Sequence, residues 1–195
     1  NSRVHRYSFT WNGSSPKGKS GVDFIKSEDP WFRPVNVKLG PDGALYVADF
    51  YNAIIGHYEV PLDHPKRDKQ RGRIWRITYK GKKNERTDLT QSALDKLIAA
   101  LDADNLPLRM AATDQITDRV GVGATESLLK VLEQPHSPRQ AVHAMWALQR
   151  FGKLTDPALR KSASSTDTLI RLHAFRALLE RPVNDGMYDL AMVGI

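Results

Sequence analysis

The chain has 195 residues, of which 41% are hydrophobic and 26% charged, a composition typical of a globular protein. No apolar run approaches the roughly 18 residues of a membrane-spanning helix. The absence of cysteine excludes disulfides, thiolate zinc sites, cysteine nucleophiles and covalently attached c-type haem within these residues. The net charge of +7 is not spread evenly, because the basic excess lies near the middle of the chain.

Polar and apolar residues alternate over residues 3–11, which predicts a strand. One face of this strand carries the ring side chains of His5, Tyr7, Phe9 and Trp11. We interpret this aromatic stripe as the packed face of a sheet, and a ligand groove is the alternative. Residues 12–21, with the sequence NGSSPKGKSG, have the composition of a loop. A short strand is predicted within residues 22–26.

Two alternating runs joined by Gly40-Pro41-Asp42-Gly43 predict a β-hairpin. Pro41 presets φ for the turn, and Gly43 can adopt the positive φ that closes it. A third alternating run over residues 73–79 extends the hairpin to an antiparallel meander. One meander buries too little surface to be stable alone, so we expect it to belong to a larger sheet assembly. The apolar faces of the three runs carry Val35, Val37 and Leu39, then Leu45 and Val47, then Trp75, Ile77 and Tyr79.

The alternation breaks between residues 49 and 72, where Pro61 and Pro65 exclude a long regular element. Polar side chains concentrate in this segment, and an irregular polar loop beside a rigid sheet is a common place for a functional site. His57 is the candidate general base, because the unperturbed pKa of histidine is near neutrality, and Asp49 could orient it. The alternative is a histidine that only hydrogen-bonds the loop.

His57 could also bind a metal together with Asp63 and His64. The spacing of these three residues is not that of any tight site, and we predict no metal. Asp42 is assigned to the turn and not to catalysis.

Ten basic residues and two acidic residues lie between His64 and Arg86. Such a cluster is compatible with a nucleic-acid site. A solvated loop followed by the outer face of a strand is the interpretation that we favour, because aromatic residues are not interleaved with the basic ones. A nucleic-acid partner is therefore not expected.

After Gly81 the periodicity changes from 2 to 3.6, and helix-forming residues dominate. Thr90 is the predicted N-cap of the first helix. Proline and glycine residues separate the predicted helices, which cover residues 90–103, 106–118, 123–133, 138–151, 156–164 and 167–181.

These helices contain a repeat. His143-Ala144-x-x-Ala147-Leu148 recurs 30 residues later as His173-Ala174-x-x-Ala177-Leu178. A period of about 30 residues built from paired helices is typical of an α-solenoid. The repeats resemble short HEAT repeats over residues 88–182. The equivalent positions of His143 and His173 favour a structural role for both.

The sequence therefore predicts an α+β fold in two parts: an antiparallel β-meander over residues 1–81 and an all-α solenoid over residues 89–195. Residues 82–88 form a charged linker. Neither end of the chain has the signals of a natural terminus, so we expect a fragment of a longer protein that is truncated within its solenoid.

The meander also carries a resemblance. DPWFRPVNVKLGPDGALYVADFYN begins at Asp29, IGH ends at His57, RD follows at Arg67, and GRIWRITY ends at Tyr79. In this order and spacing, the segments resemble the closing part of the β-propeller in PVC-type (planctomycete and verrucomicrobial) membrane-bound dehydrogenase-like haem-binding proteins. In that family a propeller similar to quinoprotein sugar and sorbosone dehydrogenases precedes HEAT repeats and a c-type cytochrome domain.

The resemblance implies the terminal blade or blades of a propeller. It also implies a periplasmic or cell-envelope oxidoreductase that oxidises a sugar, alcohol or aldehyde and passes electrons to a c-type haem domain outside this chain. The family's Arg-x-Arg-Asp-Val run faces pyrroloquinoline quinone, and Arg33 matches its first arginine. Val35 and Asn36 replace the second arginine and the aspartate, which argues against binding of this quinone. The implied cofactor-binding candidates are Arg33, Asp49, Tyr51 and Asn52.

A non-catalytic propeller and HEAT scaffold that binds protein or carbohydrate is the alternative. A propeller site is assembled from several blades, so this segment alone is expected to lack catalytic activity. The expected partners are the rest of its own propeller and a cytochrome c domain or another protein.

Overall fold

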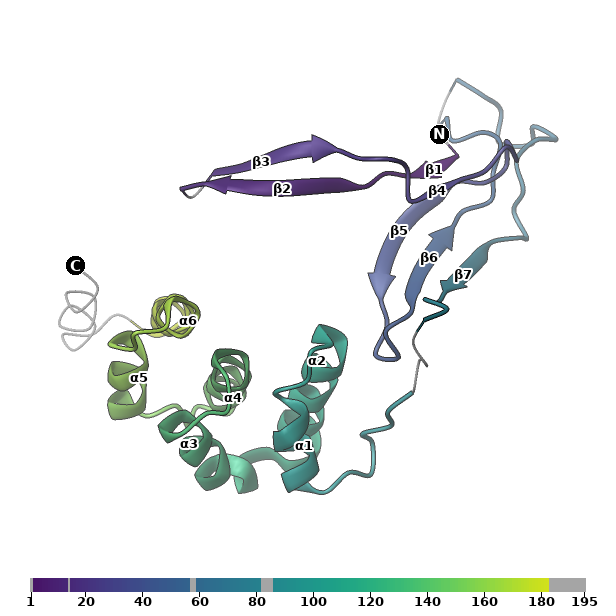
Figure 1. Ribbon diagram of the computed structural model, residues 1–195. Coiled ribbons are helices and arrows are strands. Elements are labelled where there is room, and N and C mark those ends of the chain that lie inside the picture. The colour runs from purple at the N-terminus through teal and green to yellow at the C-terminus, as the bar shows by residue number, and fades with distance from the viewer. Residues whose placement is uncertain (1, 14, 57–58, 82–85, 183–195) are drawn as a thin grey trace. The chain divides into compact units, whose positions relative to one another are not determined.

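The computed structural model describes residues 2–13, 15–56, 59–81 and 86–182, and it divides into two compact units, Asn1–Asn84 and Glu85–Ile195 (Figure 1). Within these ranges the strands lie in the first unit, the β unit, and the helices lie in the second, the helical unit. The predicted α+β organisation in two parts is confirmed at this level.

The β unit contains a three-stranded antiparallel sheet in the order β5-β6-β7. Its strands are β5 (Pro34–Leu39), β6 (Leu45–Asp49) and β7 (Arg73–Ile77). The register places Val47 of β6 between Val37 and Trp75, and it pairs Leu45 with Leu39 and Ile77. These cross-strand rows put the alternating apolar residues on one face, which confirms the predicted meander.

The turn between β5 and β6 is built as its residues predict. Gly43 has a φ of 75° and donates from its N–H to the Gly40 carbonyl (3.0 Å). The Gly40 N–H donates in turn to the Ala44 carbonyl (2.8 Å). Gly43 therefore supplies the left-handed residue that closes the hairpin.

Replacing Gly43 by valine is expected to lower the free energy of unfolding of the β unit by about 1–2 kcal/mol, because a β-branched residue is strained at positive φ. Replacement by asparagine should have a smaller effect, since asparagine tolerates this region. Urea unfolding followed by tryptophan fluorescence checks this, because Trp11, Trp31 and Trp75 are three of the four tryptophans. Equal losses for valine and asparagine would contradict the conformational explanation.

Asp42 has the structural role that the sequence assigned to it. Its buried carboxylate accepts from the Ala44 N–H (3.0 Å) and the Tyr46 hydroxyl (3.0 Å), and it pairs with Arg76 at 2.7 Å. Burial raises the pKa of Asp42, but the hydrogen bonds from Arg76, Ala44 and Tyr46 outweigh this and lower it. Asp42 thus fastens the turn to β7.

Two further strand pairs precede the sheet. β1 (Arg3–Val4) pairs with β4 (Ile25–Lys26), and β2 (Tyr7–Asn12) pairs with β3 (Ser15–Ser20) in an antiparallel ribbon. Every residue of β2 and β3 is exposed.

The β2–β3 ribbon corrects two expectations. The predicted loop over residues 12–21 is largely a strand, because Gly13 turns the chain at a φ of 59° and β3 is held by its backbone ladder with β2. A strand held without burial needs no apolar alternation, so its composition does not reveal it. The aromatic stripe of β2 is also not the buried face of a sheet, since Tyr7, Phe9 and Trp11 are 53%, 62% and 71% exposed.

The helical unit follows the predicted elements closely. Its π-helical and 3₁₀ segments are η1 (Ile116–Val120) and η2 (Gly121–Ala124). The α-helices are α1 (Leu94–Ala100), α2 (Leu106–Gln115), α3 (Thr125–Glu133), α4 (Pro138–Arg150), α5 (Asp156–Ala163) and α6 (Thr168–Leu179). The prediction that Thr90 caps the first helix is wrong. Its N–H and hydroxyl both bind the Asp88 carboxylate, and α1 begins after Ala93.

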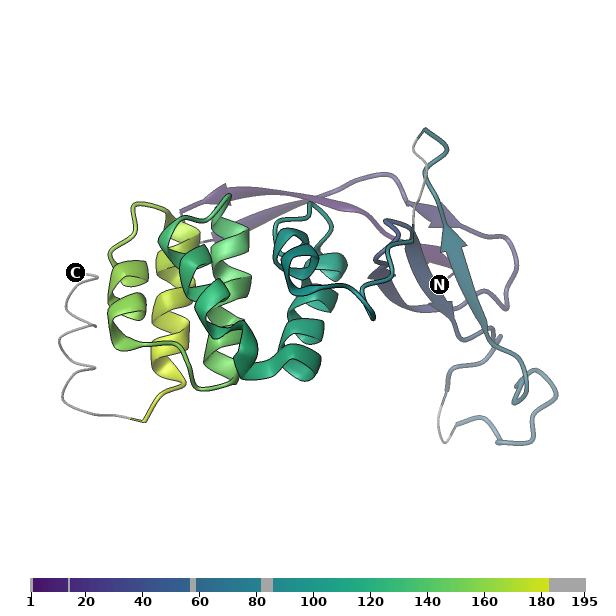
Figure 2. The ribbon, with the colours of Figure 1, turned by 90° about the horizontal axis from the view of Figure 1, so that it is seen from below.

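Successive helices pack as pairs, α1 with α2, α3 with α4, and α5 with α6. The second helices of the pairs also contact one another in the order α2, α4, α6, and α3 contacts α5 (Figure 2). The core between the helices contains Leu97, Leu101, Leu128, Met145, Leu148 and Leu159. Within the described ranges, none of these helices combines the length and apolarity needed to cross a bilayer.

Arginines fasten the connections inside the pairs. Arg109 of α2 donates to the carbonyls of Ala103 (2.6 Å) and Asp104 (3.0 Å), and Arg171 of α6 donates in the same way to Ser165 (2.7 Å) and Thr166 (2.9 Å). In the middle pair, Arg139 of α4 instead forms ion pairs with Asp102 and Asp104 in the connection between α1 and α2, at 3.2 and 2.9 Å.

Candidate functional site

Asp49 is the centre of the predicted site, and its carboxylate is buried, with the residue 3% exposed. One oxygen accepts the backbone N–H groups of Arg33 (2.8 Å) and Tyr51 (2.9 Å), and the other accepts the indole N–H of Trp75 (3.0 Å). Asp49 thereby ties the start of β5, the loop after β6 and strand β7 together. Its predicted partner His57 lies outside the described residues.

Arg33 directs its guanidinium mainly at the backbone. Its Nη1 donates to the Ser2 hydroxyl (3.3 Å) and the Phe32 carbonyl (3.4 Å), and its Nη2 donates to the Ala53 carbonyl (3.3 Å). Its Nε is buried and has no hydrogen-bond partner in the described part of the chain. Arg33 therefore links the start of the chain to the loop after β6.

Asn52 also fastens the loop, and it is 3% exposed. Its amide donates to the Asp68 carbonyl (2.7 Å) and accepts from the Asp68 N–H (3.3 Å), which reproduces one rung of a strand ladder. Arg67, next to Asp68, donates to the carbonyls of Gly56 (2.5 Å), Val60 (2.8 Å) and Pro61 (3.0 Å). The sequence does not predict these contacts of Asn52 and Arg67, because hydrogen bonds to backbone groups far away in the chain follow no local sequence pattern.

Tyr51 is the candidate with backbone strain. Its φ is 49°, a region that non-glycine residues rarely occupy, and it is held there by the hydrogen bond from its N–H to Asp49. The guanidinium carbon of Arg73 lies 3.4 Å from the centre of the Tyr51 ring, a cation–π contact. The Trp31 ring lies 5.8 Å away with an interplanar angle of 32°. The strained turn therefore brings two aromatic rings and a cation together.

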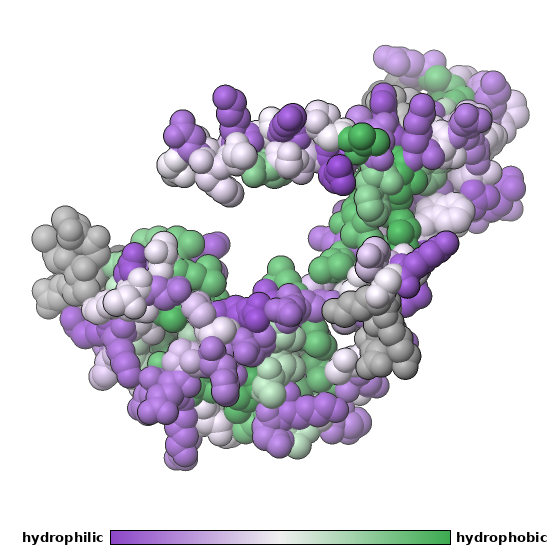
Figure 3. Space-filling model, viewed as in Figure 1, coloured by the Kyte–Doolittle hydropathy of each residue, from purple (hydrophilic) through white to green (hydrophobic). Residues whose placement is uncertain are grey.

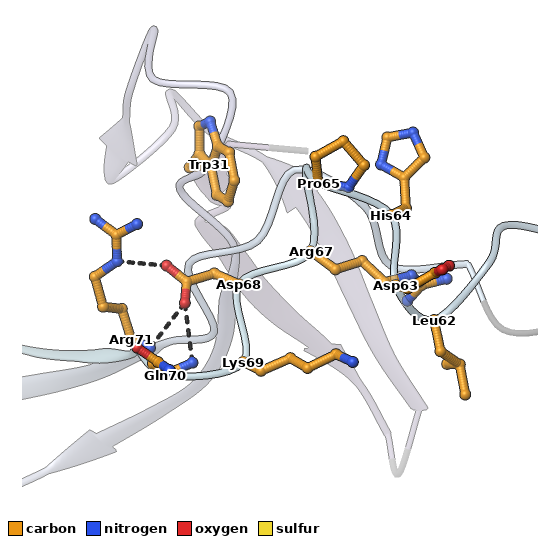
Figure 4. A pocket seen from close by; sticks show the side chains of 10 residues that line it. All are labelled: Trp31, Leu62, Asp63, His64, Pro65, Arg67, Asp68, Lys69, Gln70 and Arg71. Carbon is orange, nitrogen blue, oxygen red and sulfur yellow. Dashed lines mark hydrogen bonds and ion pairs between the residues drawn. The ribbon is translucent and has the colours of Figure 1, made fainter.

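A cavity of about 420 Å³ adjoins this cluster (Figure 4). Trp31 forms one wall, and the other lining residues are Leu62, Asp63, His64, Pro65, Arg67, Asp68, Lys69, Gln70 and Arg71. We call this space the loop cavity. Its lining is mostly polar, with Trp31, Leu62 and Pro65 as the apolar residues, so it suits a polar ligand better than an apolar one.

The polar wall of the loop cavity is organised by Asp68. Its carboxylate accepts the N–H groups of Gln70 (2.9 Å) and Arg71 (3.1 Å) and the Arg71 Nε (2.5 Å). The hydrogen bond from Gln70 is the main cause that lowers the pKa of Asp68, and it outweighs the effect of burial. At neutral pH the cavity therefore presents an ionised carboxylate beside a guanidinium. His64 accepts the Lys66 N–H at Nδ1 (3.1 Å), so a neutral ring carries its proton on Nε2.

The structure brings together part of the predicted site. Asp49 contacts the backbone of Arg33 and Tyr51, whereas Asn52 is turned toward Asp68. No cluster of three or more histidine, aspartate or glutamate residues suited to a metal occurs among the residues that the structure describes.

Residues 1–81 match a family model described as a domain of unknown function, DUF7133. No curated protein matches the chain, and no solved structure matches it. The similarity therefore covers the β unit and does not extend to the helices.

Proposed function

We propose that this chain is a non-catalytic scaffold that binds carbohydrate at the loop cavity. In this proposal the β unit is the closing part of a β-propeller, and the helical unit is a HEAT-like solenoid. The observation that carries the proposal is the arrangement of the loop. Asp49 and Asn52 hydrogen-bond to groups within the protein and so hold the loop in place, whereas the cavity beside Trp31 is open to solvent.

The propeller assignment is supported by apolar surface on the three-stranded sheet. Val35 of β5 and Ile74 of β7 are both more than half exposed. Figure 3 shows apolar residues gathered over β5 and β6. In a propeller both faces of each blade pack against neighbouring blades, which would remove this surface from water.

The solenoid assignment is supported by contacts that recur between helix pairs. Arg109 and Arg171 bind equivalent pairs of carbonyls. His143 of α4 hydrogen-bonds Arg109 and Thr113 of α2, and His173 of α6 accepts from Trp146 of α4. Each histidine thus bonds to the preceding second helix, as expected when neighbouring repeats interact in the same way.

The chemistry of the loop cavity suits a sugar ring. The C–H groups of a pyranose are electropositive and meet the electronegative face of an indole favourably, which Trp31 can offer. Hydroxyl groups both donate and accept, and the cavity lining includes an exposed acceptor in Asp63 and donors in Arg71 and Gln70. Because Arg67 and Asn52 already hold the loop, little ordering should accompany binding.

Replacing Trp31 by alanine is expected to weaken binding of soluble oligosaccharides at least tenfold. Replacing Gln70 by alanine should weaken it severalfold. Isothermal titration calorimetry with a panel of neutral and acidic oligosaccharides measures this, with Trp11→Ala as the matched control, because Trp11 is exposed and does not line the cavity. The carbohydrate proposal fails if no sugar binds at millimolar concentration or if Trp31→Ala binds as tightly as the unmodified chain.

A second candidate is the oxidoreductase implied by the family resemblance. It is a periplasmic sugar, alcohol or aldehyde dehydrogenase that passes electrons to a c-type haem domain outside this chain. The Nε of Arg33, which has no partner among the described residues, favours it, since a buried guanidinium donor is suited to a quinone carboxylate. The same calorimetry with pyrroloquinoline quinone distinguishes the candidates: quinone binding that is lost in Arg33→Met and kept in Trp31→Ala would support the oxidoreductase.

A further inference from the structure

The β2–β3 ribbon carries a continuous aromatic face. The register opposes Tyr7 to Ser20, Phe9 to Gly18 and Trp11 to Pro16, so each ring lies across from a small residue. A Cβ atom at Gly18 would lie 3.4 Å from the Phe9 ring, which shows that this ring already rests on β3. The three rings are 53%, 62% and 71% exposed in order toward the turn. We call this surface the ring face.

The opposite face of the ribbon is polar and basic. Lys17 and Lys19 lie on it, opposite Thr10 and Ser8. The Ser8 and Thr10 hydroxyls each donate to a carbonyl of β3 at 3.5 Å. No acidic residue occurs between Val4 and Val22.

A two-stranded ribbon without a buried residue is marginally stable in water, and burial of its apolar face would stabilise it. In Figure 1 the ribbon is separate from the three-stranded sheet. The charges identify what can cover it. A nucleic acid whose bases stacked on the rings would hold its phosphates on the side away from Lys17 and Lys19, which disfavours that occupant.

We propose that the ring face is a self-association surface that pairs with the ring face of a second copy of this chain. Two ribbons packed face to face lie about 10 Å apart, and the lysines then point outward from both, so their separation exceeds the Debye length of about 8 Å at physiological salt. Like charges therefore do not oppose the pairing. The same patch meets itself, which is the geometry of a two-fold symmetric dimer.

The area available sets the strength of the dimer. At about 200 Å² per aromatic side chain, the exposed fractions give roughly 370 Å² of ring surface in each copy. Two copies together would then bury roughly 740 Å² of ring surface, besides a smaller contribution from the adjoining residues of β3, which is the size of a weak, transient interface. We therefore expect a weak and reversible dimer.

Sedimentation equilibrium of the full chain between about 1 and 300 μM tests the proposal. The average mass should rise from that of one chain toward that of two. The double variant Phe9→Ser/Trp11→Ser should stay monomeric over this range, and Tyr79→Ser, which removes a ring that is 77% exposed elsewhere in the β unit, should dimerise normally. A chain that is monomeric throughout, or a dimer unaffected by Phe9→Ser/Trp11→Ser, would overturn the proposal.

Cross-linking gives a second measurement that keeps the rings intact. The chain has no cysteine, so one introduced cysteine reports a single position. Ser20→Cys lies on the ring face and Lys19→Cys on the opposite face. A short bismaleimide should join two copies of Ser20→Cys much faster than two copies of Lys19→Cys. Equal rates, or a monomer that binds oligo-dT through its rings, would contradict the dimer.

Discussion

Replacing Asp49 by alanine is expected to lower the free energy of unfolding of the β unit by about 3–5 kcal/mol. The change leaves three donors, the N–H groups of Arg33, Tyr51 and the Trp75 indole, without their acceptor in a buried site. Each unsatisfied buried donor costs about 1–3 kcal/mol, and the three losses overlap because the site can relax. The strained backbone of Tyr51 would also lose the bond that holds it.

Urea unfolding followed by tryptophan fluorescence measures this loss, while ellipticity at 222 nm follows the helical unit separately, because the described helices begin at Leu94. Replacing Asp49 by asparagine keeps one acceptor oxygen and should lose only about 1–2 kcal/mol, chiefly the bond to Trp75. Asp63→Ala is the matched surface control and should change stability by less than about 0.5 kcal/mol. A small effect of Asp49→Ala would show that the loop is not fastened through this carboxylate.

The helical unit is expected to lose about 2–3 kcal/mol of stability between pH 7 and pH 4.5 through His143 alone. Burial, followed by the charge of Arg109 and then His173, lowers the pKa of His143 from 6.5 to about 4. Arg109 donates to Nε2 of His143, so the neutral ring carries its proton on Nδ1 toward Thr113. Protonation at Nε2 would break the bond from Arg109.

The direction of the pH dependence follows from the pKa of His143 in the unfolded chain and in the folded chain. The unfolded chain binds a proton at pH 6.5 and the folded chain only near pH 4, so this stabilisation is complete above pH 6.5 and is lost as the pH falls toward 4. A shift of this size corresponds to about 3 kcal/mol, which partial solvation of the ring reduces. His173 adds to the trend, because burial and Arg176 lower its pKa as well.

Urea midpoints from the 222 nm signal at pH 7 and pH 4.5 provide the measurement. In His143→Gln the dependence should flatten by about 2 kcal/mol, since glutamine does not titrate. His136→Gln is the control, because His136 is an exposed histidine of the same unit. The pH dependence would not arise from His143 if both variants retained it in full.

The parts that the sequence predicts well are those with local causes. Pro41 and Gly43 fix their turn by their own backbone preferences, and the meander follows from side-chain alternation. The helices follow from apolar periodicity and from the prolines and glycines that separate them, whereas the one predicted cap, Thr90, is wrong because it binds Asp88 instead.

The parts that the sequence does not predict depend on distant partners. Strand β3 exists because it pairs with β2, and nothing in its composition requires that pairing. Asp49 could be recognised as a special residue, but its partner Trp75 lies 26 residues away, and Asn52 bonds to Asp68 across 16 residues. From the sequence alone, a polar residue in a loop is therefore compatible both with binding a ligand and with holding the loop in place through hydrogen bonds.

The arginine contacts at the helix connections indicate where the helical unit could gain or lose a pair of helices. Arg171 binds two carbonyls of its own connection and the Thr168 hydroxyl of its own helix, so duplication or deletion of the α5–α6 hairpin would leave the partners of Arg109 and Arg139 in place. Arg139, by contrast, depends on Asp102 and Asp104 of the hairpin before it. By these arginine contacts α4 is coupled to the α1–α2 connection, whereas α6 binds its own connection, so the chain near Gly152 is where an added helical hairpin would disturb the fewest of them.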